Sequence, residues 1–462
     1  MNGLFVQQSV FLLSFRDALI LIAADAIYER MEVFLMEYEA TRAILVGLCT
    51  GDGEAEELEK SLAELERLLD TAGGVCFAKL VQNKDKPDPR TLIGSGKVLE
   101  LAALCQANGI ELVVFDEELS PSQIRNLEDD IGNDVRVIDR SMLILDIFAL
   151  HAVSREGKLQ VELAQLKYTA PRLTGQGKDL SRLGGGIGTR GPGESKLESD
   201  RRHMKHRIVA LEEELRALDK NRRTMRAARD RSGLPKIAIV GYTNAGKSTL
   251  LNRLTDAGIL AEDKLFATLD PTTRKFELPS GENVLLTDTV GFIRKLPHHL
   301  IKAFKSTLDE AVYADILMIV LDVSDEEFPS QLEVTEKLLE ELGASGKPTL
   351  YVFNKCDLGA KGLPSIGTPA DHTWTVAVSA RTGQGIDRLT DLLTEILHAG
   401  KRRVTFHIPN SEGGALNTLY QFATVEDVEY GPEGMLATAV VDAKTHGMLK
   451  KYDPHWVEPR ED

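Results

Sequence analysis

The chain has 462 residues, of which 43% are hydrophobic, so it is long enough to bury several cores. Its formal net charge of -16 argues against a protein that is basic over its whole surface, although a local basic patch for nucleic acid stays compatible with that charge. The 4 cysteines lack metal-ligand spacing, which favours a reduced, cytoplasmic protein over a disulfide scaffold.

Residues 1–40 precede the first predicted strand. The apolar run at residues 10–24 is interrupted by Arg16 and Asp17 and is too short to span a bilayer, so we expect no stable membrane insertion. Met31 and Met36 stand just before the first strand. We therefore interpret residues 1–40 as an N-terminal extension, of which the residues before about Met36 are dispensable for folding and for nucleotide binding.

Short apolar runs alternate with helical patterns over the next hundred or so residues. The leucines at 58, 62, 65 and 69 have helical spacing, and glycines follow them. The expected strands cover residues 43–48, 75–81 and 110–115, and the expected helices cover residues 54–70, 96–107 and 120–130. This alternation predicts a small α/β domain over residues 41–139.

Longer helical patterns fill residues 140–233. Met204, Ile208, Leu211, Leu215 and Leu218 have the three-and-four spacing of a coiled-coil-like seam, and a shorter helix with similar spacing precedes them. Between the two lies a stretch rich in glycine and proline, GGGIGTRGPGES, and we expect residues 171–195 to form a loop. The pattern predicts a helical hairpin with a glycine-rich tip.

Residues 234–400 alternate buried strands with helical patterns. The expected strands cover residues 236–240, 283–287, 316–321, 349–353 and 375–378. Such alternation predicts a doubly wound, mainly parallel sheet. Strand-like runs at residues 404–408 and 435–441 then surround a helical stretch at 416–422, so we expect a small α+β domain over residues 401–462.

The stretch GYTNAGKST fits the pattern G-x-x-x-x-G-K-[ST] and stands between a predicted strand and a predicted helix. Backbone amides in such a loop, with the positive end of the following helix, hold phosphate oxygens. We expect Lys247 to neutralise the β- and γ-phosphates and Ser248 to supply a hydroxyl ligand to Mg²⁺. The loop comprises Gly241, Tyr242, Thr243, Asn244, Ala245, Gly246, Lys247, Ser248 and Thr249.

Three further motifs follow later predicted strands, which makes a chance match to the phosphate loop improbable. They are DTVG at Asp288, Thr289, Val290 and Gly291, NKCD at Asn354, Lys355, Cys356 and Asp357, and SAR at Ser379, Ala380 and Arg381. In DTVG, we expect Asp288 beside the outer ligand shell of Mg²⁺ and the Gly291 amide near the γ-phosphate.

The base that this site binds is indicated by NKCD and SAR. The Asp357 carboxylate can accept hydrogen bonds from N1–H and from the 2-amino group of guanine, which adenine does not offer. We expect Lys355 to pack along the ring and a backbone amide of SAR to face guanine O6. Together the motifs predict a site for GTP and GDP.

A segment with the sequence FATLD lies between the phosphate loop and DTVG, where a mobile segment should supply a threonine to Mg²⁺. It comprises Phe266, Ala267, Thr268, Leu269 and Asp270. We choose Thr268 for this ligand, while Thr272 and Thr273 remain alternatives. The predicted catalytic groups are Lys247, Thr268 and Gly291.

At these residues the sequence resembles the HflX family of ribosome-associated GTPases, through GYTNAGKST, LFATLDPTTR, DTVGFI and NKCD. Upstream, TLIGSGKVLEL, VVFDEELSPSQIRNLE, DRSMLILDIFALHA and GGGIGTRGPGESKLE also resemble that family, so the likeness extends over residues 41–400. The resemblance implies a GTPase that binds the large (50S) ribosomal subunit and its rRNA. It also implies action on stalled, idle or stressed ribosomes, including dissociation of the subunits.

Basic residues gather in the second helix of the predicted hairpin, although the whole chain is acidic. They are Arg201, Arg202, Lys205, Arg207, Arg216, Lys220, Arg222, Arg223, Arg226, Arg229 and Arg231. One interpretation is a solvated coiled-coil face; the other is contact with RNA phosphates, for which the candidates are Arg190, Arg201, Arg202 and Lys205. The competing function is a GTP-dependent signalling switch that recruits a protein partner without RNA.

Two details limit the chemistry. Phe292 follows Gly291 where many GTPases place a water-orienting glutamine, so we expect slow hydrolysis that depends on a partner. The stretch IGSGK at residues 93–97 lacks the first glycine and the final hydroxyl of a phosphate loop, but the resemblance leaves weak ATP binding in the N-terminal region open. We expect a monomer.

Overall fold

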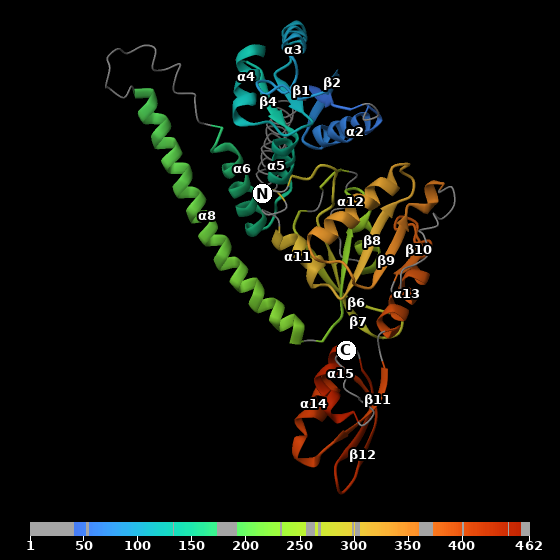
Figure 1. Ribbon diagram of the computed structural model, residues 1–462. Coiled ribbons are helices and arrows are strands. Elements are labelled where there is room, and N and C mark those ends of the chain that lie inside the picture. Colours follow the sequence, from blue (N-terminus) through green and yellow to red (C-terminus); the bar gives the residue numbers. More distant parts are fainter. Residues whose placement is uncertain are drawn as a thin grey trace, which may run out of the picture.

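The computed structural model describes residues 41–51, 55–132, 134–172, 192–231, 233–255, 264–266, 269–297, 300, 305–359, 373–399, 402–441 and 443–453. The predicted N-terminal extension, the tip residue Arg190 and the pair Ala267 and Thr268 lie outside the described residues. Three sheets succeed one another along the chain (Figure 1).

The first sheet is parallel, with the order β2-β1-β3-β4. Its strands are β1 (Thr41–Cys49), β2 (Gly74–Asn83), β3 (Leu112–Phe115) and β4 (Arg136–Asp139), and its helices are α2 (Ala55–Thr71), α3 (Ser95–Asn108) and α4 (Pro121–Ile131). Alternate residues of β1 enter different cores, because side chains of a strand point to opposite faces. Both faces are therefore covered, and the predicted α/β organisation is confirmed. Strand β4 was not predicted, because its four residues are too few to show the hydrophobic pattern of a strand clearly.

Three helices follow: α5 (Arg140–His151), α6 (Arg155–Thr169) and α8 (Pro192–Arg231). The 40-residue helix α8 lies along α6 at the side of the molecule (Figure 1). Leu211 of the predicted seam is fully buried. The expected loop was too long at its far end, since α8 already begins at Pro192. Proline is accepted in the first turn of a helix because its missing N–H has no partner there.

The central sheet has the order β10-β9-β8-β5-β7-β6. Its strands are β5 (Lys236–Gly241), β6 (Thr272–Glu277), β7 (Asn283–Asp288), β8 (Ile316–Asp322), β9 (Thr349–Asn354) and β10 (Thr373–Ala377). All neighbours are parallel except β6, which is antiparallel to β7, and the predicted doubly wound sheet is confirmed. Strand β6 was not predicted, because it is a half-exposed edge strand with mostly polar residues.

Helices cover both faces of this sheet (Figure 1). They are α9 (Lys247–Thr255), α11 (Lys305–Tyr313), α12 (Phe328–Glu341) and α13 (Ile386–Ala399), with a 3₁₀ turn η1 (Cys356–Leu358) after β9. The apolar face of α13 buries Leu389, Leu393 and Ile396. No helix among the residues that the structure describes is long and apolar enough to cross a membrane.

The C-terminal sheet is antiparallel, with the order β11-β13-β12. Its elements are β11 (Arg402–Ile408), η2 (Asn410–Glu412), α14 (Gly414–Phe422), β12 (Thr424–Tyr430), β13 (Met435–Val441), α15 (Ala443–Leu449) and η3 (Lys450–Tyr452). Phe406, Leu419 and Ala437 are fully buried between sheet and helices. The expected α+β fold is confirmed; the acidic strand β12 was missed because its polar residues hide the strand pattern.

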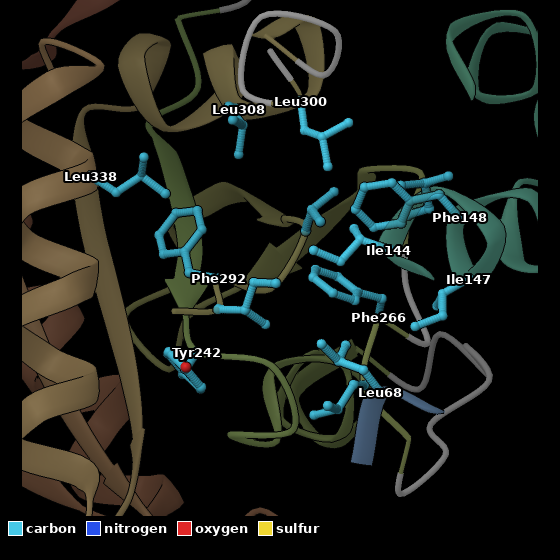
Figure 2. Packing of buried hydrophobic residues seen from close by; sticks show 14 of the residues in the cluster. Leu68, Ile144, Ile147, Phe148, Tyr242, Phe266, Phe292, Leu300, Leu308 and Leu338 are labelled. Carbon is cyan, nitrogen blue, oxygen red and sulfur yellow. The ribbon is translucent and has the colours of Figure 1, made fainter. Parts of the chain in front are cut away.

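One apolar core joins the first sheet to the central sheet. It combines residues of α2 and α5 with Phe266 and with Phe292, as Figure 2 shows. The rings of Phe266 and Phe148 meet edge to face, with centroids 4.7 Å apart. The helices that precede the central sheet are therefore packed directly against the DTVG and FATLD segments.

Candidate nucleotide site

The predicted motifs come together at one edge of the central sheet. The phosphate loop follows β5, DTVG follows β7, NKCD follows β9 and SAR follows β10, and these strands run parallel. In open α/β sheets, ligands bind outside the carboxyl ends of such strands. Residues more than a hundred positions apart in the sequence therefore line a common edge.

Two glycines of the phosphate loop are required by backbone geometry. Gly241 has φ +144, and a Cβ there would lie 2.3 Å from the Val320 carbonyl oxygen. Gly246 has φ +92, and a Cβ there would lie 2.2 Å from Nδ2 of Asn354. Any side chain at either position would clash, so the loop can approach β8 and the NKCD motif only with glycine.

Lys247 is buried at the start of α9, with 6% of its surface exposed. Its Nζ donates a hydrogen bond to the Tyr242 carbonyl oxygen at 2.7 Å. Burial lowers the pKa of the ammonium to about 8, and the nearby Asp288 carboxylate partly opposes this shift. A buried cation whose hydrogen bond within the described part of the chain goes to one backbone carbonyl is well suited to neutralise a phosphate.

Ser248 and Asp288 lie side by side. The Ser248 hydroxyl donates to Oδ2 of Asp288 at 2.7 Å, and Asp288 is fully buried. Its other oxygen, Oδ1, has no hydrogen-bond partner among the described residues. Burial raises the pKa of Asp288. A hydroxyl beside a carboxylate with an unsatisfied oxygen fits Mg²⁺, which takes oxygen ligands and keeps several waters.

Gly291 lies directly over the phosphate loop. A Cβ on it would be 2.8 Å from Cα of Thr243 and 2.9 Å from Nζ of Lys247, so only glycine fits. The next residue pairs with the loop, because the Thr243 amide donates to the Phe292 carbonyl at 2.8 Å and the Phe292 amide donates to Gly241 at 3.1 Å. The Phe292 ring itself is buried, so it cannot orient a water molecule.

Asn354 connects the phosphate loop with the SAR loop. Its Nδ2 donates to the Ala245 carbonyl at 2.8 Å, and its Oδ1 accepts from the Ala380 amide at 3.0 Å. Arg253 of α9 donates to the carbonyl oxygens of Ala380 and Arg381, which fixes the same loop from the other side. The segments expected to hold phosphates and base are thus one connected unit.

The remaining residues of NKCD stand at the edge of this unit. Lys355 has a left-handed backbone with φ +62, and its Nζ lies 2.7 Å from Oδ2 of Asp322. Asp357 is exposed in η1, where its carboxylate is accessible to a base. The Cys356 amide donates to the Val378 carbonyl at 3.2 Å, which holds this turn against the strand before SAR.

The FATLD segment is turned toward the preceding helices. Phe266 and Leu269 are buried there, and the Asp270 carboxylate is bound at the start of α6. Thr268 lies outside the described residues, so its predicted contact with Mg²⁺ stays a prediction. Of the alternatives, Thr273 lies in β6 with its hydroxyl 3.0 Å from that of Thr287.

A buried charge cluster beside the phosphate loop was not predicted. The Arg140 guanidinium is 2% exposed and lies 2.9 Å from Oε1 of Glu64 and 2.7 Å from Oδ1 of Asp116. Lys295, just after DTVG, also binds Asp116, and Tyr242 donates to Glu64. The sequence feature that could have indicated this cluster is Glu64, since it falls on the apolar face of a predicted amphipathic helix.

Strained backbone conformations also gather at this site. Among the described residues other than glycine, positive φ values occur at Leu92 and at four positions in or beside the nucleotide motifs. Those four are Asn244, Phe266, Lys295 and Lys355. Left-handed backbone at non-glycine residues is unfavourable and tends to persist at functional sites, so its location supports the assignment of the motifs.

Comparison with protein families covers three successive stretches of the chain. Residues 59–149 match the family described as GTP-binding GTPase N-terminal, and residues 151–229 match GTP-binding GTPase Middle Region. Residues 236–355 match the family described as 50S ribosome-binding GTPase. The three matches follow the order of the first sheet, the long helices and the central sheet.

Comparison with individual proteins gives long alignments. The chain is 50% identical over 408 residues to GTPase HflX of Lacrimispora saccharolytica, which covers 88% of this chain and 95% of that protein. It is 42% identical over 401 residues to GTPase HflX of Escherichia coli (strain K12), covering 86% and 93%. A crystal structure of a GTP-binding protein from Sulfolobus solfataricus in complex with GDP is 26% identical, covers 77% of this chain and 98% of that chain, and has a TM-score of 0.40.

Proposed function

This chain belongs to the HflX family of GTPases, and from that premise we propose that it hydrolyses GTP with Mg²⁺ on the large ribosomal subunit, in the cytoplasm. The activity we propose there is dissociation or rescue of stalled or idle ribosomes. The nucleotide part of this proposal rests on the two hydrogen bonds of the Asn354 side chain, which join the phosphate loop to the SAR loop.

The residues of the site take the following roles in this proposal. Lys247 exchanges its backbone acceptor for the β- and γ-phosphates, and the amide of Gly291 donates to the γ-phosphate. Ser248 and Thr268 would hold Mg²⁺, and the Asp288 carboxylate beside Ser248 would support them. Mg²⁺ would neutralise charge that develops on the phosphates.

Guanine is selected at the end of the nucleotide site that NKCD and SAR form. The exposed carboxylate of Asp357 accepts from N1–H and the 2-amino group, while the SAR loop presents an amide to O6. A site built to bind a donor pair discriminates strongly against a base that lacks it. Arg253, which holds two carbonyl oxygens of the SAR loop, keeps that amide in position.

The ribosome part of the proposal is supported by the distribution of charge on α8. Arg207 and Arg222 of α8 form ion pairs with Glu162 and Glu156 of α6, at 2.7 Å and 2.8 Å. These pairs hold the two helices together. Arg201, Arg202 and Lys205 are exposed near the start of α8, next to the glycine-rich stretch.

Two features suit this end of the hairpin to RNA. Exposed arginine and lysine can neutralise phosphates, and a glycine-rich segment can follow an irregular surface. Hydrolysis would need a partner because buried Phe292 replaces the side chain that many GTPases use to orient water. We propose that the large subunit supplies the missing group.

The test is co-sedimentation of the full-length protein with isolated 50S particles. We expect binding with a non-hydrolysable GTP analogue and much weaker binding with GDP. Changing Arg201, Arg202 and Lys205 together to Ala should weaken binding and reduce its salt dependence, since fewer counterions are released. A triple change of exposed acidic residues on α12, Glu333, Glu340 and Glu341 to Gln, is the matched control.

If 50S particles do not bind in either nucleotide state, the ribosome proposal is wrong. A protein that binds GTP normally yet ignores the ribosome would instead fit the competing function, a signalling switch that recruits a protein partner.

A further inference from the structure

One hydroxyl of the phosphate loop is buried without a hydrogen-bond partner. Thr243, the third residue of the loop, is 7% exposed, and its Oγ1 has no partner among the described residues. Buried hydroxyls in folded proteins nearly always have a partner, because burial removes them from water. The unpaired Oγ1 therefore needs a specific explanation, and a ligand that supplies the missing acceptor is one.

The rest of Thr243 is held firmly in place. Its amide donates to the Phe292 carbonyl at 2.8 Å. Its methyl carbon Cγ2 lies against Gly291, since a Cβ on Gly291 would be 2.7 Å from that carbon and 2.8 Å from Cα of Thr243. A β-branched side chain has few allowed rotamers, so this methyl contact also restricts the hydroxyl. The hydroxyl is thus kept inside the loop by its own side chain.

Other hydroxyls of the nucleotide motifs are already paired within the protein. Thr289 of DTVG donates to the Ile239 carbonyl at 2.8 Å, and Ser248 donates to Asp288 at 2.7 Å. Thr289 is as deeply buried as Thr243, yet it has an acceptor. Burial in this part of the fold therefore does not by itself leave a hydroxyl unpaired.

Thr243 stands next to the two groups that are proposed to bind the γ-phosphate. Its Cγ2 and Nζ of Lys247 lie 2.7 Å and 2.9 Å from the same point above Gly291. In the proposed function, Lys247 binds the β- and γ-phosphates and the Gly291 amide donates to the γ-phosphate. An oxygen of that phosphate is therefore the acceptor that best suits the Thr243 hydroxyl.

We propose that the Thr243 hydroxyl donates a hydrogen bond to a γ-phosphate oxygen of GTP, which makes Thr243 a further catalytic residue. This inference rests on the proposed function. In hydrolysis a water oxygen bonds to Pγ while the bond from Pγ to the bridging oxygen breaks. The electron pair of that bond leaves on GDP, and both protons of the water end on the released phosphate. A fixed donor on the transferring group stabilises its charge during this step.

The same hydroxyl distinguishes GTP from GDP. GDP has no γ-phosphate, so with GDP bound the Thr243 hydroxyl stays unpaired. A site built to hydrogen-bond one ligand discriminates against a ligand that lacks the matching group. The unfavourable burial of Oγ1 is relieved only by the triphosphate, which favours the GTP state.

The test is titration of the full-length protein with GDP and with the β,γ-imido analogue of GTP, both with Mg²⁺. Thr243→Val keeps the shape of the side chain but removes the hydroxyl. We expect its affinity for the analogue to fall about tenfold or more, and its GDP affinity to stay within about twofold of wild type. Single-turnover GTP hydrolysis should slow by about tenfold or more. Thr243→Ser keeps the hydroxyl and should recover most of both losses.

Melting of the nucleotide-free protein separates this role from a structural one. Thr243→Val replaces an unpaired buried hydroxyl with a methyl group, so it should melt at or above the wild-type temperature. Thr335 of α12 is the matched control, because it is fully buried and its hydroxyl donates to the Gln331 carbonyl at 2.8 Å. Thr335→Val should leave both nucleotide affinities unchanged.

Three outcomes would overturn the inference. If Thr243→Val binds the imido analogue as tightly as wild type, or loses affinity for GDP equally, its hydroxyl does not meet the γ-phosphate. If nucleotide-free Thr243→Val melts well below wild type, the hydroxyl has a partner within the fold. The proposed function fails separately: undiminished GDP affinity in Lys247→Ala would show that this loop is not the nucleotide site, and the role of Thr243 would fall with it.

Discussion

The hydroxyl of Tyr242 donates a hydrogen bond to the carboxylate of Glu64, which joins the second residue of the phosphate loop to helix α2. The same hydroxyl accepts a hydrogen bond from the Arg294 amide at 2.7 Å. Burial raises the pKa of Tyr242, so the hydroxyl keeps its proton and remains a donor. One side chain therefore ties together the phosphate loop, the residues after DTVG and the first α/β layer.

Tyr242→Phe should destabilise this contact. It leaves a buried carboxylate oxygen and a buried amide without their partner, which typically reduces stability by about 1–3 kcal/mol. We expect a lower melting temperature and, in a double-mutant cycle with Glu64→Gln, clear non-additivity. Tyr351→Phe is the control, since its hydroxyl donates to Glu336 at 2.7 Å, in a part-buried contact that involves neither the phosphate loop nor α2. Additive effects would show that the two residues are not coupled.

Arg140→Met should be among the most destabilising single changes in the chain. It removes the cation from between Glu64 and Asp116, and breaking a buried pair in this way typically costs about 3–5 kcal/mol. Urea unfolding at neutral pH measures the loss. Adding Asp116→Asn should recover part of it, because one uncompensated charge is removed. A loss below about 1 kcal/mol would contradict the role we give to Arg140.

The pH dependence of that loss can also be predicted. Burial alone would raise the pKa of Asp116, but Arg140 and Lys295 outweigh it and hold the pKa below its ordinary value. In the wild type, this group therefore stabilises the fold above its unfolded pKa and loses that effect as pH falls through the folded value. In Arg140→Met, burial should instead raise the pKa of Asp116. The variant should therefore gain stability relative to wild type as pH falls toward 5. A constant difference would contradict this account.

Nucleotide binding should take up protons in alkaline solution. The pKa of Lys247 is about 8, and phosphates should raise it on binding. Affinity for GDP should therefore be full below pH 8 and fall as pH rises through 8, with uptake of up to about one proton near pH 9. Calorimetry in buffers of different ionisation enthalpy measures this. Lys247→Ala should bind GDP far more weakly at every pH. If GDP binding to the wild type released protons instead of taking them up, this prediction would be contradicted.

Asp357→Asn should change which base is preferred. An amide at this position offers a donor where guanine also offers donors, whereas xanthine presents an acceptor. We expect GTP affinity to fall by about 100-fold or more while XTP affinity rises. Competition between the two nucleotides measures the change, and Asp325→Asn, in the loop after β8, is a control. Continued preference for GTP over XTP would remove Asp357 from the base site.

Much of this arrangement could be predicted from the sequence. The parallel strands of the central sheet carry continuous apolar runs, and each nucleotide motif stands at the end of one, so periodicity and motif order agree. Strands β6 and β12 were missed because polar residues at an edge conceal the alternation that marks a strand.

The contacts between layers could not be predicted. Glu64 and Tyr242 are 178 positions apart, and Ser154 and Asp270 are 116 positions apart. Nothing in local spacing pairs such residues, since the pairing arises only when the α2 and α5 helices pack against the DTVG and FATLD segments. The sequence around Gly157 gives no reason for a glycine, because the Asp270 oxygen that would lie 2.6 Å from a Cβ there comes close only in the folded chain.

The most direct test of the central claim is GTP turnover with and without 50S particles, by the wild type and by a variant in which residues 184–193 are replaced with a short linker. We predict slow turnover by both proteins alone and strong stimulation of the wild type by 50S particles. The variant should keep its basal turnover and lose most of the stimulation, because the replaced segment contains none of the nucleotide motifs. Equal stimulation of both proteins, or none of the wild type, would contradict the account.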